Sequence, residues 1–252
     1  MVTVRIFKLQ HLIRFMRAFH LLTTIGEERG NIEFYKSGLD FVVISRHLFV
    51  LLHIRHPFLH HYQPPNSSNY FTIHLKEFRQ HLGHRALTSS SMDFNLDHHY
   101  PPLAALTFHD DNSGARFTRI INVSNSEHIG KLGGLTIKKF VSMDSEKFKL
   151  IVMEFMNIDK VNVVLTNSQV TFSSEFKEIT INAEDQGCII SGVDDGERIQ
   201  YSVRFQPTSF FCDLANLIEK VTFYHETTKR NIAMSAPIGF NSIFIINFLN
   251  IE

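Results

Sequence analysis

The residues of this 252-residue chain that first suggest chemistry are its histidines. Four of them fall between His53 and His61, and two more are adjacent at His98 and His99. A zinc site needs Cys partners or the His-Glu-x-x-His spacing, and neither accompanies these residues. We therefore expect loop histidines and no metal site here.

Two short stretches partly match catalytic or phosphate-binding motifs. Gly130-Lys131 is followed by Leu132 and lacks the preceding glycine of a phosphate-binding loop. Asp194-Asp195-Gly196 is more simply a hairpin turn. Ser, His and Asp residues are present, but not at the spacing of a nucleophile elbow. The sequence therefore predicts neither an enzyme nor a bound cofactor.

The composition is that of a globular protein, with 44% hydrophobic and 20% charged residues. The length suits one large domain or two of ordinary size. Two cysteines without a Cys-x-x-Cys spacing argue against a disulfide scaffold and fit a reducing compartment. Polar residues interrupt the most apolar stretches, 39–54 and 238–249, so neither supplies the about 20 apolar residues of a membrane span.

Charge is distributed unevenly along a chain whose formal net charge is zero. Residues 1–109 carry 11 Lys and Arg against 7 Asp and Glu, whereas residues 110–252 carry 14 against 18. A basic half is suited to an anion such as a nucleic-acid backbone. Chance variation of surface charge is the alternative explanation.

Periodicity predicts strands and amphipathic helices in the first half. Residues 2–7 alternate as in a strand, and residues 9–22 repeat apolar side chains at helical spacing. A hairpin follows at 31–52 with its turn at Lys36-Ser37-Gly38, and a second helix buries Leu75, Phe78 and Leu82. Further strands are expected at 92–96 and 103–108.

The second half repeats this order. A strand at 137–143 leads to a helix that Ser145 caps and whose apolar face runs from Phe148 to Ile158. A hairpin, several short strands and a second short helix at 207–217 follow. We predict an α+β fold with internal repetition: a domain at 1–116, a connector at 117–135 and a domain at 136–252.

With this order in view, the chain resembles the proliferating cell nuclear antigen family of eukaryotic sliding clamps over nearly its whole length. The most specific match is Ser126-Glu127-His128-Ile129-Gly130, which looks like the interdomain connecting loop of that family. Arg46-His47-Leu48, Ser209-Phe210-Phe211 and the ending Phe248 to Glu252 also match family segments. Their order and spacing carry the resemblance.

The resemblance implies two tandem clamp-type domains of one topology, with helices on one concave face and curved antiparallel sheets outside. Three such subunits would close head to tail around double-stranded DNA without sequence preference. The expected function is that of a nuclear processivity factor for replication and repair. It would tether a DNA polymerase and other proteins that carry short apolar clamp-binding motifs.

Helix faces opposite the apolar stripes would supply phosphate contacts in the pore. The expected DNA-binding residues are Lys8, Arg14, Arg17, His20, Lys76, Arg79, Gln80 and Lys149. Ordinary solvated surface is the alternative. The positions where the family has pore cations but this chain does not are Ile13, Gln80, Gly83, Met153, Gln206 and Asp213. Fewer phosphate contacts predict weaker retention of DNA.

The resemblance also implies an apolar groove for partner motifs under the connector. The matching residues are Val43, His47, Leu48, Val50, Ile129, Lys131, Arg230, Ile246 and Phe248. Plain core is the alternative for the aliphatic members. Arg230 and Lys131 stand where the family has apolar residues and make the groove more polar. The lysine of the family's ubiquitin attachment falls near Asn167-Ser168, so we expect no such regulation.

Two rival functions remain open at this stage. One is a subunit of a mixed or checkpoint-type clamp, which the missing pore cations favour. The other is a β-rich interaction module with no DNA function, in which the repeat is only structural.

Overall fold

The computed structural model describes residues 2–7, 9–55, 59, 61–63, 69–97, 102–126, 139–185, 187–226, 231–239 and 241–249. The described chain is α+β: four helices accompany strands that pair antiparallel in two sheets. It divides into two compact units. Unit 1 is Met1–Ile44, Leu51–Ile129 and Gly239–Ile243, and unit 2 is Ser45–Val50, Gly130–Ile238 and Phe244–Glu252.

Unit 1 begins with a strand, a helix and a run of short strands. Its elements are β1 Val2–Phe7, α1 Leu9–Thr24, β2 Arg29–Tyr35, β3 Gly38–Ile44, β4 Leu48–Arg55, β5 His61–Gln63, β6 Asn69–His74, α2 Leu75–Thr88, β7 Ser91–Asp97, β8 Leu103–Asp110 and β9 Ala115–Asn125. β1 pairs with β5 and β7, and β8 lies between β7 and β9. β2 pairs with β3 and β6.

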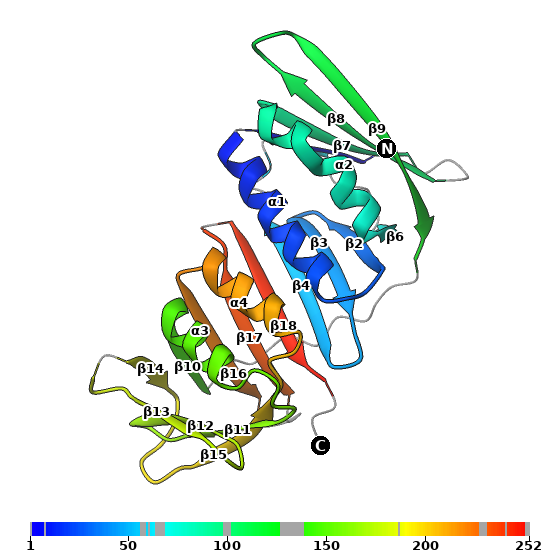
Figure 1. Cartoon of the computed structure of the whole chain (residues 1–252). Coiled ribbons are helices and arrows are strands. Elements are labelled where there is room, and N and C mark those ends of the chain that lie inside the picture. The colour runs from blue at the N-terminus through cyan, green and yellow to red at the C-terminus, as the bar shows by residue number, and fades with distance from the viewer. Residues whose placement is uncertain are drawn as a thin grey trace. The chain divides into compact units, whose positions relative to one another are not determined.

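Aromatic side chains hold the two helices of unit 1 on its strands. In Figure 1, α1 and α2 lie side by side. Between them the ring centroids of Phe19 and Phe78 are 4.6 Å apart, and Phe19 meets Phe41 of β3 edge to face at 5.3 Å. Rings at this separation add to the stability that apolar burial gives. The packing fixes which helix faces remain outside.

Unit 2 has helices of ten residues each among its strands. Its elements are β10 Lys139–Asp144, α3 Ser145–Glu154, β11 Val161–Leu165, β12 Gln169–Ser173, β13 Glu178–Asn182, β14 Cys188–Ser191, β15 Ile199–Val203, α4 Thr208–Leu217, β16 Lys220–Glu226, β17 Asn231–Pro237 and β18 Ser242–Phe248. β10 pairs with β14 and β16, and β16 with β17. β11 pairs with β12 and β15, and β13 with β12. The division into units passes through both β4 and β18.

The core of unit 2 is also built from phenylalanines. Phe148 of α3 packs against Phe205, Phe211 and Phe223 with centroids 5.8 to 6.4 Å apart. Phe248 of β18 stacks on Phe211 with an interplanar angle of 7°. These side chains are at least about nine-tenths buried, so their helices have a fixed inward face.

Three local predictions need correction. Residues 117–125 of the predicted connector form most of β9, because they pair with β8 or β6. Ser145 is the first residue of α3 and not its cap; the N-cap is Asp144, which makes no side-chain capping bond. The helix ends at Glu154, before Ile158, and Asn157 in the turn that follows has a φ of 69°.

Candidate nucleic-acid interface

The outward face of α1 carries a line of nitrogen-bearing side chains. Leu12, Phe15 and Phe19 are buried on its inner side. Arg14 and Arg17 are exposed, and His20 is half-buried one turn further along. Residues three apart lie on one helix face, so the period that buries the aromatic side chains also aligns these groups outside.

The outward face of α2 continues the pattern. Phe78 and Leu82 are buried, whereas Lys76, Arg79 and Gln80 are exposed. Gly83 interrupts the helix with φ 22° and ψ −149°. The regular stripe of α2 therefore ends at this glycine.

One hydrogen bond joins these helix faces, and its acceptor hydroxyl makes two further contacts within α1. Arg79 Nη1 of α2 donates to Thr23 Oγ1 of α1 at 3.5 Å. The same hydroxyl donates to the His20 carbonyl at 2.7 Å and lies 3.3 Å from His20 Nδ1. The structure thus brings His20 and Arg79, which are 59 positions apart in the sequence, onto one surface.

Arg14 lies against the turn that precedes β18. A Cβ atom built on Gly239 would come within 3.1 Å of Arg14 Nη1. Gly239 has a φ of 68°, in the left-handed region that favours glycine. Glycine therefore leaves room for the guanidinium at this position.

Carboxylates lie close to Lys76 and Gln80 and reduce the positive charge at the N-terminal part of α2. Lys76 and Gln80 line a polar pocket of about 320 Å³ together with His74, Glu28 and Glu77. Within the described residues, no ion pair links Arg14, Arg17, Lys76 or Arg79 to a carboxylate. The three arginines are therefore the strongest candidates for phosphate contacts.

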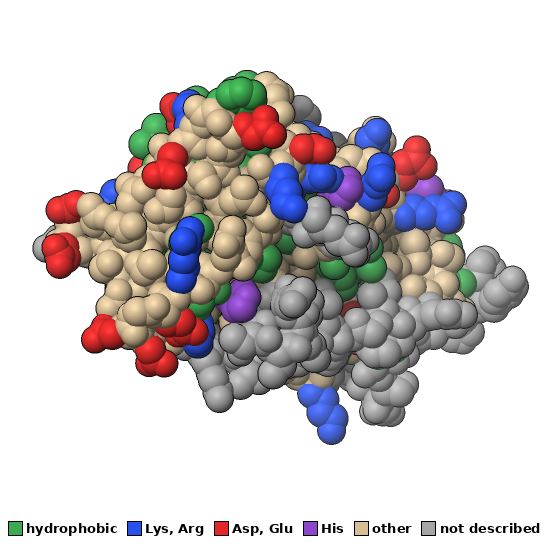
Figure 2. All heavy atoms as spheres, turned by 90° about the horizontal axis from the view of Figure 1, so that it is seen from below, with side chains coloured by type: hydrophobic (Ala, Val, Ile, Leu, Met, Phe, Trp, Pro, Cys, Tyr) green, Lys and Arg blue, Asp and Glu red, His purple; other side chains and the backbone are tan. Residues whose placement is uncertain are grey.

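Lys149 is a predicted DNA-binding residue that does not lie on α1 or α2. Lys149 belongs to unit 2, is half-buried, and donates from Nζ to Asn216 Oδ1 of α4 at 2.8 Å. Lys8 lies outside the described residues. The face of the molecule seen from below in Figure 2 carries Asp and Glu as well as Lys and Arg side chains, so that face is not uniformly basic.

The resemblance predicts pore cations at several positions where this chain has other residues, and the described ones are not all on the surface. Met153 and Asp213 are exposed on α3 and α4, whereas Ile13 and Gln206 are half-buried. Met153 is 49% exposed. At these two positions the unit 2 helices thus expose an apolar and an acidic side chain, where the resemblance predicts cations.

Most described members of the predicted partner groove are core residues. Val43, Leu48, Val50 and Ile246 are fully buried. Phe248 retains 8% exposure and stacks within the aromatic core of unit 2. Ile129, Lys131 and Arg230 lie outside the described residues. The groove remains a prediction from the resemblance.

His47 is the half-exposed exception. Burial lowers the pKa of His47, and the positive charges of Arg204 and Arg46 lower it further, while Asp159 opposes them. Arg204 donates from Nε to the Asp159 carbonyl at 2.8 Å. The imidazole is therefore neutral at physiological pH and adds no positive charge to this part of unit 2.

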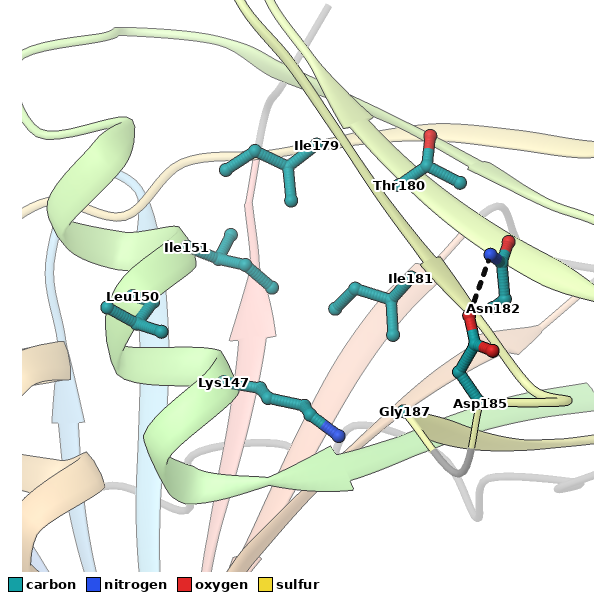
Figure 3. Close-up of a pocket in the computed structure, with 9 residues that line it drawn as sticks. All are labelled: Lys147, Leu150, Ile151, Ile179, Thr180, Ile181, Asn182, Asp185 and Gly187. Carbon is teal, nitrogen blue, oxygen red and sulfur yellow. Dashed lines mark hydrogen bonds between the residues drawn. The ribbon is translucent and has the colours of Figure 1, made fainter.

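Sequence analysis missed an apolar groove between α3 and the strand β13. A cavity of about 340 Å³ is bounded by Leu150 and Ile151 of α3 and by Ile179 and Ile181 of β13. Figure 3 shows both β13 isoleucines pointing toward α3. Their alternation with polar residues was the available signal, but it predicts only a half-buried strand.

Among the described residues, no three His, Cys, Asp or Glu side chains are grouped so that they could hold a metal ion. No described helix is both long enough and apolar enough to cross a bilayer.

Comparison with known proteins provides no assignment. No protein-family model matches the chain, and a search of curated proteins gives no match. The fold and the strand edges therefore support the functional proposal together with the outward faces of α1 and α2. These faces, hereafter the α1–α2 surface, carry Arg14, Arg17, His20, Lys76 and Arg79.

Proposed function

We propose that this chain is a subunit of a DNA sliding clamp, a non-enzymatic ring that tethers polymerases and repair proteins to duplex DNA in the nucleus. The proposal keeps two tandem clamp-type domains as its structural basis. The observation that supports it most strongly is that helices and strands follow one another in the same order, and pair in the same way, in both units.

The recurrence extends to individual pairings. Unit 1 runs as strand, helix, five strands, helix and three strands, and the elements from β10 to β18 follow the same order. β1 pairs with β5 and β7 as β10 pairs with β14 and β16. β2 pairs with β3 and β6 as β11 pairs with β12 and β15. A duplicated unit with paired helices suits a ring built from repeated domains.

Open strand edges support head-to-tail association. β13 ends its sheet. β9 pairs with β8 through residues 115–122 and with β6 through Val123–Asn125. On the side of β9 that faces away from β8, residues 115–122 therefore have no described partner strand. In the described chain, each unit thus has an edge whose backbone groups suit pairing with another chain.

The two edges have complementary side chains. β9 exposes Arg116 and Arg119 together with Phe117 and Ile120, which are 38% and 56% exposed. The acidic residues on β13 and its flanking turns are Glu175, Glu178, Glu184 and Asp185. The apolar groove beside β13 suits the apolar side chains of β9. Opposite charges favour joining β9 of one copy to β13 of the next.

Duplex DNA is then expected at the α1–α2 surface. Arg14, Arg17 and Arg79 would contact phosphates, which carry no sequence information and allow sliding. The mixed clamp remains a second candidate, because the outward side of the unit 2 helices lacks this positive charge. A β-rich interaction module would need neither a ring nor DNA.

Light scattering tests the assembly first. A homotrimeric ring has a mass about three times the 29.1 kDa of the chain. We expect Arg119→Glu or Glu178→Arg alone to lower this mass, and the two together to restore it. Ile189→Asp on β14 is the matched control for surface disruption. A chain that stays monomeric alone and with related clamp subunits would refute both ring proposals.

Loading on circular DNA tests the function itself. A loaded clamp remains on a closed circle and slides off after the circle is cut, because it encircles the duplex. Equal retention on circular and linear DNA, or none on either with a clamp loader present, would contradict the proposal.

A further inference from the structure

The outer side of α3 is apolar. Leu150, Met153 and Met156 are 61%, 49% and 52% exposed. Leu150 and Met153 are three residues apart on the helix, and Met156 lies in the turn just beyond the C-cap residue Phe155. Surface Leu and Met residues that occur singly need no explanation, but a line of them along one helix indicates a contact surface.

The turn between β12 and β13 adds an aromatic side chain to this region. Lys177 in that turn forms an ion pair with Glu154 at the end of α3. The neighbouring Phe176 is 88% exposed and is therefore placed near the C-terminal end of the helix. Leu150, Met153, Met156 and Phe176 are hereafter the α3 apolar surface.

Acidic side chains accompany the α3 apolar surface. Glu146 lies one helical turn before Leu150. Glu154 lies one turn after Leu150 and is already paired with Lys177. The exposed carboxylates Glu175 and Glu178 flank Phe176 in the sequence, and α4 exposes Asp213. The nearby Lys149 is half-buried and bonded to Asn216. This charge disfavours a phosphate backbone and favours a basic partner.

We propose that the α3 apolar surface docks a basic amphipathic helix of a partner protein. Apolar side chains of that helix contact Met153, Met156 and Phe176, and its Lys and Arg residues lie beside the carboxylates. Methionine adapts its shape to different apolar partners, which suits this mode of recognition. The inference requires neither ring formation nor DNA binding. It shares Leu150, Glu175 and Glu178 with the edge proposed to receive β9 of the next copy, so one subunit cannot make both contacts at once.

A synthetic helix of leucine and lysine with about 18 residues, labelled with a fluorophore, serves as the probe. Fluorescence anisotropy with the full chain measures binding, and a leucine and glutamate helix of the same pattern is the charge control. We expect the lysine peptide to bind and the glutamate peptide to bind at least about tenfold more weakly. Absence of binding by the lysine peptide, or equal binding of both, overturns the proposal.

A double variant locates the contact. Met153→Ser with Phe176→Ser should weaken binding of the lysine peptide at least about tenfold. Both residues lie outside the cavity of Figure 3, and Ile189→Ser replaces a similarly exposed apolar residue elsewhere in unit 2. Equal affinity in the double variant and the Ile189→Ser control overturns the proposal. A double variant that instead lowers the mass of the assembly identifies a second copy as the occupant and overturns it too.

Discussion

Neutralising Arg14 and Arg17 together gives the most direct test of the α1–α2 surface. Both side chains are exposed, and neither forms an ion pair with a described carboxylate. Arg14→Gln with Arg17→Gln should therefore remove phosphate contacts while leaving the fold intact. The expected loss lies in DNA affinity and not in stability.

The magnitude follows from counterion release. Each phosphate contact contributes about 0.9 to the slope of log affinity against log salt concentration. Two lost contacts lower the slope by about 1.8 when one chain of the complex contacts the duplex, which corresponds to about 60-fold weaker binding near 0.1 M salt; contacts by further chains add to this loss. Fluorescence anisotropy with a duplex, repeated over a series of salt concentrations, measures this slope.

Lys149→Gln is the matched control for charge. Its ammonium is already bonded to Asn216 on the neighbouring helix, so the variant should change the salt slope by much less than one contact. An unchanged slope in the double arginine variant, or an equal change in Lys149→Gln, would refute the assignment of DNA to the α1–α2 surface.

Two further predictions concern stability. Gly38→Ala should lower the free energy of unfolding in urea by about 3 kcal/mol or more, because the new Cβ would lie 2.0 Å from the Ile54 carbonyl oxygen. Gly114→Ala is the control: it has open space around it and should cost only about 1 kcal/mol, so equal costs for the two variants would contradict the prediction. Burial and, less strongly, the charge of Lys139 lower the pKa of His225. As pH falls, this histidine therefore gains a proton in the unfolded chain before it does so in the folded chain. The free energy of unfolding consequently decreases as pH falls below about 6.5. His225→Phe should reduce the difference in urea midpoint between about pH 7.5 and pH 5, and an unchanged difference would exclude this cause.

The features of the fold that could be predicted from the sequence are mostly those that produce a local periodic pattern of apolar residues. The spacing of Leu12 and Phe19 predicts a helix with Arg14 and Arg17 outside, and the structure places all four as expected. These relations span one or two turns, so the chain determines them without reference to distant residues. Ile13 and Met16, expected on the apolar face, are half-buried at its margin.

Features that depend on distant pairing required the tertiary structure. Residues 117–125 look like a polar connector in isolation, yet β8 and β6 pair with them and make them a strand. Sequence patterning predicts Lys149 as a solvent-facing cation, but Asn216, 67 positions away, accepts a hydrogen bond from its ammonium. Neither contact leaves a periodic signal in the sequence.

Single segments of the sequence are enough to predict which residues alternate, which helix faces are apolar and where the basic residues concentrate. The core positions of Val43, Leu48, Val50 and Ile246 emerged only from the folded chain. The same is true of the strand edges: no described strand pairs with one side of β13, or with residues 115–122 of β9 on the side away from β8. Burial and strand pairing are properties of segments brought together, whereas periodicity is a property of one segment alone.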